Sequence, residues 1–279
     1  MLRLMSNNIW WCDSNQPAWE AIGEDCSAAA RAKGFARVYS ELCPDVIGFQ
    51  EVSAIMLREL VGAMQELGEK YAVLWGGDTP IMYRPNKLEL IDSDFAYYDE
   101  HIDGFEGCFN NDKTKSYTVA VFKSKENGKA FVFATTHLWW KSSNPSSNSY
   151  QAHSNEARAY QISLLADVVE RFAKKYGCPS VIVGDLNAGY GSMAIDAIFQ
   201  KGYRHGHDIA TEYADDTNGY HYCYGDGYRG YEPEAFERGI DHILFKGERE
   251  GAVSRFDRYY PEYYMPLSDH FPAFVDVEF

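Results

Sequence analysis

The chain has 279 residues, of which 46% are hydrophobic and 24% are charged. This balance is usual for a folded globular protein and excludes a disordered, collagen-like or coiled-coil protein and a small disulfide-bonded scaffold. The 26 Lys and Arg residues against 41 Asp and Glu residues give a net charge of −15. Nonspecific nucleic-acid binding is therefore not expected, because it depends on basic side chains that neutralise phosphates.

The six cysteines are spread along the chain without a C-x-x-C pair, and we expect most of them to be reduced thiols in the core. No apolar run approaches the roughly 20 residues that a membrane helix needs. The N-terminal segment 1–5 is too short for the apolar part of a signal peptide. We expect a cytoplasmic protein, or an exported one if a leader precedes this sequence. The oligomeric state is left open.

The first half of the chain predicts alternating strands and helices. The expected elements are a strand over 2–9, a helix over 28–42 that ends before Pro44, a strand over 46–49, a helix over 56–67, and strands over 71–74, 81–83 and 88–95. The turn Pro85-Asn86-Lys87 joins the last two strands.

The second half continues this alternation. The expected elements are a hairpin of 117–122 and 130–138, a helix with an apolar face from Ala157 to Phe172, a strand over 180–183, a helix over 192–200, a Gly/Tyr-rich stretch over 202–239, and strands over 240–245, 252–259 and 273–279. No linker divides residues 1–279, so we expect a single domain. Hairpins mixed with crossover helices predict an α/β fold, a four-layer α-β-β-α sandwich of two packed mixed sheets flanked by helices.

Polar residues that can bind a metal stand where the predicted strands end. They are Asn8, Gln50-Glu51, His137, Asp185 with Asn187, Asp241-His242 and Asp269-His270. Sites in layered α/β folds are built at strand ends, and oxygen ligands favour Mg²⁺ or Mn²⁺ over zinc. The chain has no nucleotide-binding glycine loop and no G-x-S-x-G elbow. The polar residues at the strand ends therefore predict metal-assisted hydrolysis of a phosphate ester.

Six short motifs resemble, in their order and separations, those of the endonuclease/exonuclease/phosphatase superfamily, which has the deoxyribonuclease-I-like fold. The motifs are Ser6-Asn7-Asn8-Ile9-Trp10, the segment from Pro44 to Glu51, Thr136-His137-Leu138, Gly184-Asp185-Leu186-Asn187, Ile240-Asp241-His242-Ile243 and Ser268-Asp269-His270. The resemblance runs nearly from end to end. It implies a single domain with a metal-dependent phosphoesterase activity.

The resemblance also implies a metal site. Glu51 would be the principal ligand of Mg²⁺ or Mn²⁺, with Asn8 and Asp269 beside it. Whether one or two ions are bound is left open.

The catalytic residues that the resemblance implies are His270, Asp241, Asp185, Asn187 and His137. Asp241 would orient His270, and either His270 or Asp185 would take the proton of the attacking water. Asn187 and His137 would donate hydrogen bonds to the phosphoryl oxygens. His242, next to Asp241, faces the other side of its strand if side chains alternate, and we expect no catalytic role for it.

Aromatic residues make up 15% of the chain, and some stand beside the motifs. Aromatic walls suit a stacked base, a sugar face or a lipid headgroup. We expect substrate contacts from Trp139 first, then from Trp140, and from Arg158, whose segment resembles the family's R-x-x-Q. The tyrosines between 213 and 231 are further candidates.

The acidic charge favours a small, sugar-linked or lipid-linked phosphodiester or phosphomonoester over a nucleic acid. The alternatives are an endonuclease or exonuclease on DNA or RNA, and a non-catalytic interaction module on the same fold. A glycoside hydrolase with a carboxylate pair is a third possibility that leaves Asp269 and His270 unexplained.

Overall fold

Two sheets lie face to face in the computed structural model, which describes residues 1–213, 239–259 and 261–279. The seven-stranded sheet has the order β10 (Glu212–Tyr213), β12 (Val253–Arg258), β13 (Ala273–Val277), β1 (Leu2–Asn8), β2 (Val46–Gln50), β4 (Ile81–Tyr83), β3 (Ala72–Leu74). The six-stranded sheet has the order β5 (Leu88–Tyr97), β6 (Ser116–Ser124), β7 (Ala130–His137), β8 (Ser180–Asp185), β11 (Asp241–Lys246), β9 (Arg204–His205).

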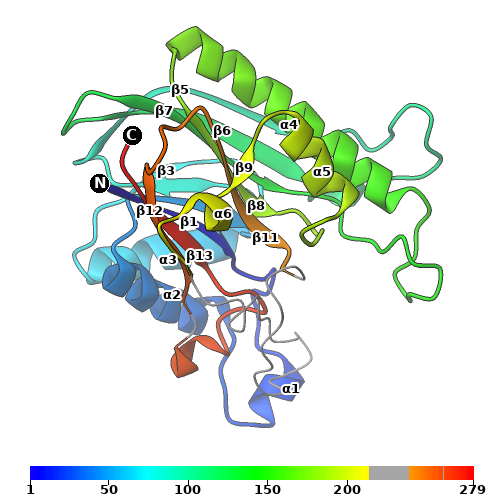
Figure 1. Cartoon of the computed structure of the whole chain (residues 1–279). Coiled ribbons are helices and arrows are strands. Elements are labelled where there is room, and N and C mark those ends of the chain that lie inside the picture. Colours follow the sequence, from blue (N-terminus) through cyan, green and yellow to red (C-terminus); the bar gives the residue numbers. More distant parts are fainter. Residues whose placement is uncertain (214–238, 260) are drawn as a thin grey trace.

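Helices cover the outer face of each sheet (Figure 1). On the seven-stranded sheet lie α2 (Ala28–Leu42) and α3 (Ala54–Glu66), and on the six-stranded sheet lie α4 (Ser154–Tyr176) and α5 (Met193–Gln200). A third apolar cluster, which includes Leu4, Phe133 and Val275, fills the space between the sheets. The protein is therefore the predicted α/β sandwich with four layers.

Short elements complete the described chain. They are α1 (Pro17–Glu20), α6 (Gly206–Ile209), and the 3₁₀ turns η1 (Asn111–Lys113) and η4 (Glu262–Tyr264).

Local chemistry explains where α2 begins and ends. The side chain of Ser27 accepts a hydrogen bond from the backbone N–H of Ala30, which satisfies one free donor of the first turn. Cys43 ends the helix in a left-handed conformation, with φ of 50°. Pro44 follows and cannot continue the helix.

Strand register brings the predicted motif residues together. His137 at the end of β7 pairs with Asp185 at the end of β8, and Asp185 pairs with Asp241 at the start of β11. In the other sheet, Asn8 pairs with Gln50, which directly precedes Glu51. Because β1 and β2 pack against β7 and β8, these two rows meet at one end of the sandwich.

The structure confirms the predicted hairpin, since β6 and β7 pair antiparallel. The strands joined by Pro85-Asn86-Lys87 do not pair with each other: β4 belongs to the seven-stranded sheet and β5 pairs with β6 in the other. That turn carries the chain from one sheet to the other. The Gly/Tyr-rich stretch contains β9, α6 and β10 up to residue 213.

The expectation that most cysteines are core thiols was wrong for the described part of the chain. Cys12 and Cys26 are buried, Cys43 is exposed, and Cys108 and Cys178 are partly exposed; all five are free thiols. Cys223 lies outside the described residues. Within the described residues, none of the helices is both long enough and apolar enough to span a bilayer. The cytoplasmic location stays a prediction.

Candidate active site

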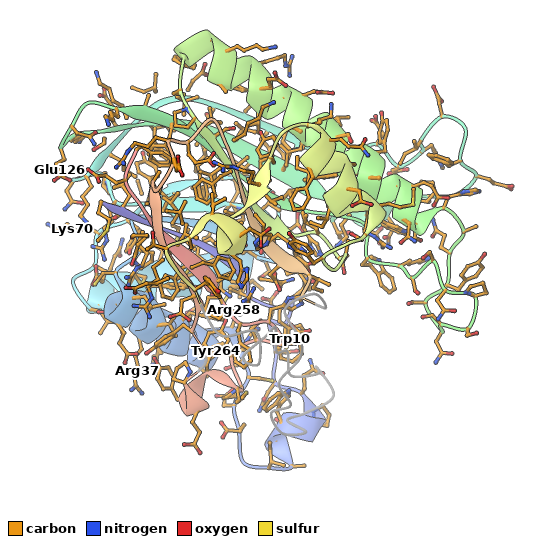
Figure 2. All side chains as sticks on the ribbon, viewed as in Figure 1. Trp10, Arg37, Lys70, Glu126, Arg258 and Tyr264 are labelled. Atoms are coloured by element: carbon orange, nitrogen blue, oxygen red, sulfur yellow. The ribbon has the colours of Figure 1, made fainter. Side chains whose placement is uncertain are left out.

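A cleft of about 440 Å³ opens at the end of the sandwich where the two rows of motif residues meet. It is lined by Trp11, Glu51, Asp78, Asn111, Thr114, Lys115, His137, Trp140, Asp185, Asn187, Asp269 and His270. Figure 2 shows Trp10, which follows β1 at this end, at the lower centre of the molecule and well away from Glu126 at its left edge, in the turn between β6 and β7.

His270 and Asp241 form a hydrogen-bonded pair in this cleft. Nδ1 of His270 donates to Asp241 Oδ2 at 2.7 Å, and Nε2 lies 3.9 Å from Asp185 Oδ2. The backbone N–H of His270 donates to Ser268 Oγ at 3.1 Å, which fixes the turn before β13. Burial lowers the pKa of His270, but the charge of Asp241 and its hydrogen bond outweigh burial and raise that pKa well above its usual value. The ring is therefore held in one orientation, and its protonated form is favoured.

Glu51 and Asp185 are bridged by Asn8. Its Nδ2 donates to Glu51 Oε1 at 3.2 Å and to Asp185 Oδ2 at 3.0 Å, while its Oδ1 accepts the N–H of Trp10 at 3.0 Å. The face of Asn8 toward the carboxylates is thus a donor. In this arrangement Asn8 positions two carboxylates, and its expected role beside a metal stays a prediction.

The backbone around this cluster is strained. Glu51, Trp10 and Asn187 have φ of 60°, 57° and 48°, values that non-glycine residues seldom adopt and that gather at functional sites. The N–H of Trp11 donates to Glu51 Oε2 at 2.8 Å. Burial raises the pKa of Glu51, but His137, Lys115 and the Trp11 N–H lower it to about 2. Glu51 is therefore a carboxylate.

Asp269 shows that the site suits a cation. Its Oδ1 is buried and has no hydrogen-bond partner among the described residues, and burial raises the pKa of Asp269 to about 7. A buried carboxylate oxygen with no donor is unstable unless a proton or a cation meets it. Ligand atoms of Glu51, His137 and Asp185 lie within 4.8 Å of one another. This oxygen-rich set fits a hard divalent ion.

His137 lies between two charged residues that no motif predicted. Lys115 Nζ is 2.8 Å from His137 Nε2, and Asp78 Oδ2 is 3.4 Å from His137 Nδ1. Asp78 is itself held by Ser116, whose Oγ donates to Oδ1 at 2.6 Å. In the sequence, only their positions next to strands could have indicated these two residues. Lys115 directly precedes β6, and Asp78 stands three residues before β4.

Asn187 lies in the cleft beside Asp185. Its backbone N–H donates to Asp185 Oδ1 at 2.8 Å, and its Nδ2 donates to the carbonyl of Leu138 at 3.1 Å. The turn after β8 therefore holds Asn187 at the cleft, where an amide can face a phosphoryl oxygen.

The expected substrate contact by Trp139 is contradicted. Trp139 is 1% exposed and packs edge-on against Phe109, whereas Trp140 is 46% exposed and lines the cleft. Of two adjacent tryptophans, only one can face the cleft when the other fills the core behind it. Trp11, 54% exposed, forms a second aromatic wall of the cleft.

Arg158 does not line the cleft either. Its Nη1 donates to the carbonyls of Trp139 and Lys141 at 3.0 and 2.7 Å, and burial lowers its pKa to about 10. The guanidinium thus holds the loop that presents Trp140, which corrects its expected role as a substrate ligand. Of the tyrosines expected between 213 and 231, Tyr213 is exposed in β10 and does not line the cleft, and the others lie outside the described residues.

His242 lies away from the cleft, as strand alternation predicts. Its Nε2 donates to the carbonyl of Ala188 at 2.7 Å, and its Nδ1 contacts His205 Nε2 at 3.1 Å. Burial lowers the pKa of His242 to about 4.

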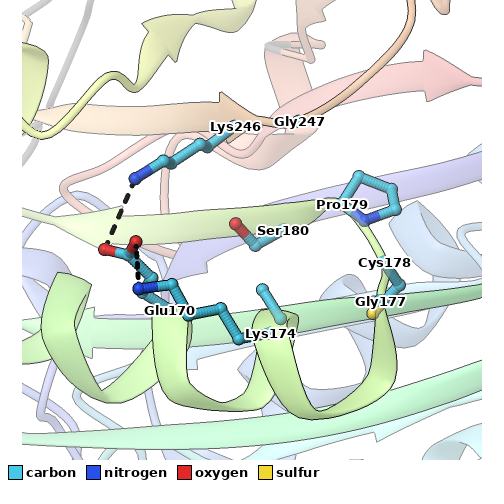
Figure 3. Close-up of a pocket in the computed structure, with 9 residues that line it drawn as sticks. Glu170, Lys174, Gly177, Cys178, Pro179, Ser180, Lys246 and Gly247 are labelled. Carbon is cyan, nitrogen blue, oxygen red and sulfur yellow. Dashed lines mark ion pairs between the residues drawn. The ribbon is translucent and has the colours of Figure 1, made fainter.

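A second hollow lies at the other end of β8, beside Ser180 (Figure 3). Its charges are already paired, since Glu170 bridges Lys174 at 3.1 Å and Lys246 at 3.4 Å. Among the described residues, the cleft with His270 holds the metal-competent side chains that the motifs predicted.

Comparisons with known proteins agree with this geometry. The model of the Endonuclease/Exonuclease/phosphatase family matches residues 8–270. A family protein from Bacteroides thetaiotaomicron is similar over 98% of this chain and 93% of its own, with 20% identity and a TM-score of 0.73. A mannosyl-6-phosphatase from the same species is similar over 100% of both chains, with 19% identity and a TM-score of 0.70.

A TDP2 from D. rerio, solved with a single-strand DNA product, is similar over 98% of this chain and 97% of its own, with 13% identity and a TM-score of 0.66. No curated protein sequence matches the chain. At these identities, the solved structures show the shared fold.

Proposed function

The chain belongs to the Endonuclease/Exonuclease/phosphatase family, and on that premise we propose that it is a divalent-metal-dependent hydrolase of a small, sugar-linked phosphate ester. The main support for a hydrolase is the His270–Asp241 pair. It shares one cleft with Glu51, Asp185 and the carboxylate oxygen of Asp269 that has no partner among the described residues. This set combines a cation site with a proton-transfer group.

Glu51 and Asp269 would hold the cation, with Mg²⁺ as the first candidate and Mn²⁺ as the second. When bound, the ion would supply positive charge that stabilises the phosphoryl and leaving oxygens. The negatively charged side chains of Glu51 and Asp185 lie close together, and the amide of Asn8 orients both by donating a hydrogen bond to each.

The geometry around His270 and the raised pKa of its ring support one division of the proton roles. A protonated His270 donates, so its Nε2 would hydrogen-bond a phosphoryl oxygen, and Asp185 would accept the proton of the attacking water. Asn187 and His137 would donate to the other oxygens, and Lys115 would add a positive charge beside His137.

The walls of the cleft support a small substrate that carries a ring. A volume of about 440 Å³ is within the range of small-molecule sites. Trp11 and Trp140 expose apolar ring faces next to the phosphate site, and Asn111 and Thr114 offer polar groups to hydroxyls. A sugar has this combination of an apolar face and polar edges. The structural neighbour that is a mannosyl-6-phosphatase points in the same direction.

The alternative is a nuclease, because another neighbour was solved with a DNA product. The net charge of −15 opposes it, since a polyanion would meet long-range repulsion. A non-catalytic interaction module is the third reading, and the complete set of cleft residues opposes it.

A panel of phosphate esters tests the proposal. We expect turnover of hexose phosphates and p-nitrophenyl phosphate with Mg²⁺ or Mn²⁺, and its loss with EDTA and in His270→Ala. The panel also includes bis-p-nitrophenyl phosphate, inositol phosphates, a choline phospholipid, an oligonucleotide and plasmid DNA.

The other results of the panel separate the alternatives. Plasmid nicking at low enzyme concentration, without turnover of small esters, would replace our substrate class with a nuclease. The absence of both turnover and calorimetric metal binding would favour the interaction module.

A further inference from the structure

The segment between β1 and α2 carries two thiols in one small apolar cluster. Cys12 is 5% exposed and Cys26 is 0% exposed, and both pack with Trp19 beside Trp10. The cluster is separate from the three large clusters of the sandwich. These two side chains therefore face each other across the loop 12–26.

The hydrogen bonds of the two sulfurs converge. Cys12 Sγ donates to the carbonyl oxygen of Ser14 at 3.0 Å, and Cys26 Sγ lies 3.9 Å from the same oxygen. Gln16 contacts both sulfurs, through its backbone N–H to Cys26 at 3.2 Å and through Nε2 to Cys12 at 3.5 Å. Burial raises the pKa of Cys26, and a hydrogen bond with the Cys12 thiol adds to this rise.

We propose that Cys12 and Cys26 are a disulfide-forming pair that closes the loop 12–26 under oxidising conditions. The co-reactant is a small peroxide, which can reach the slightly exposed Cys12. The Cys12 sulfur attacks one peroxide oxygen, the O–O bond breaks, and a sulfenic acid and water form. The Cys26 sulfur then attacks the Cys12 sulfur, the S–O bond breaks, and a second water leaves with the Cys26 proton. Two thiols and one hydrogen peroxide give one disulfide and two waters.

The closed loop adjoins the cleft. Arg31 donates to the carbonyls of Cys12 at 2.6 Å and Leu267 at 2.7 Å, and it also contacts the Ile9 carbonyl. The N–H of Trp11 is held by Glu51. A link from Cys12 to Cys26 would therefore close the loop 12–26 directly beside Trp11, which lines the cleft.

Peptide mapping of the oxidised wild-type protein tests the pair directly. Trypsin cuts after Arg3 and Arg31, and the peptide from Leu4 to Arg31 contains these two cysteines and no others. After mild hydrogen peroxide treatment and blocking of free thiols, we expect this peptide to be lighter than the reduced peptide by two hydrogen atoms. A Glu-specific protease, which cuts after Glu20 and Glu24, should leave two fragments that separate only after reduction.

Matched variants complete the experiment. Cys26→Ser should abolish the linked peptide, whereas Cys43→Ser, which removes an exposed thiol outside the cluster, should keep it. The linked wild type should melt roughly 5–10 °C above the reduced protein, because a 15-residue loop is closed.

Two results would overturn the proposal. One is a Leu4–Arg31 peptide that keeps both thiols free while Cys43 becomes oxidised. The other is a link from Cys12 or Cys26 to a different cysteine of the chain. Neither result depends on the enzymatic activity proposed above.

Discussion

Asp241 and Asp185 lie directly opposite each other on the antiparallel strands β11 and β8, and His270 contacts both. Asp241 Oδ2 accepts a hydrogen bond from His270 Nδ1 at 2.7 Å, and Asp185 Oδ2 lies 3.9 Å from His270 Nε2. One carboxylate orients the ring, and the other faces the cleft where substrate would bind. The register of one strand pair thus separates the two roles.

Replacement of Asp241 tests the orienting role. In Asp241→Asn we expect kcat to fall by about 10²–10⁴-fold, because the ring loses its orientation and its stabilised positive charge. Asp241 raises the pKa of His270, so removal of the charge should move the limb of the pH–rate profile that reports His270 to lower pH. Full-range pH profiles of kcat measure this. Retention of wild-type kcat would contradict the assigned role.

The metal site predicts a loss of binding in Glu51→Gln. Because this change removes a charged oxygen ligand and keeps the side-chain volume, Mn²⁺ affinity should fall by more than about 100-fold. Isothermal titration calorimetry measures the affinity. Glu89→Gln, an exposed residue of β5 outside the cleft, is the matched control and should bind as the wild type does. Equal affinities in the two variants would rule out Glu51 as a ligand.

The adjacent tryptophans predict opposite phenotypes. Trp139→Ala should lower the free energy of unfolding by about 3–5 kcal/mol, since it empties a fully buried site. Trp140→Ala should change stability by about 0.5 kcal/mol or less, and should raise KM for a hexose phosphate about tenfold with little effect on p-nitrophenyl phosphate. Urea unfolding and steady-state kinetics separate the two. If Trp139→Ala raised KM and Trp140→Ala lowered the stability, Trp139 and not Trp140 would contact the substrate.

Lys115 predicts a charge effect on substrate binding. Lys115→Met should lower kcat/KM by about 10- to 100-fold, because a hydrogen bond from a charged donor contributes about 1.5–3 kcal/mol. Lys113→Met, two residues earlier and exposed, is the control with the same change of charge. If both variants lose activity equally, the effect comes from the net charge and not from the cleft.

Stability should depend on pH through His242. Burial lowers the pKa of His242 to about 4 in the folded protein, against about 6.5 when unfolded. The unfolded chain therefore binds the proton first, and stability falls as pH drops from about 6.5 to about 4, by roughly 3 kcal/mol at most. Urea midpoints at pH 7 and pH 5 measure the loss. His242→Gln, which cannot titrate, should lose less stability between pH 7 and pH 5. If the variant loses as much stability as the wild type, other groups cause the pH dependence.

The sequence was sufficient for the fold and for most of the residues that the structure brings together in the cleft. Alternating apolar strands and helices predicted the four layers, since burial of one face of each element leaves few arrangements. The motifs predicted His270, Asp241, Asp185 and Glu51, because each stands next to an apolar strand and such ends meet at one edge.

Only the tertiary structure decided which neighbouring side chain faces the cleft. Trp139 and Trp140 are equivalent in sequence, and packing against Phe109 selects the one that is buried. Lys115 comes to His137 only because β6 pairs with β7. The orientation of the Asn8 amide depends on the N–H of Trp10. Residue type and order determine what chemistry is available, whereas strand register and packing determine which atoms meet.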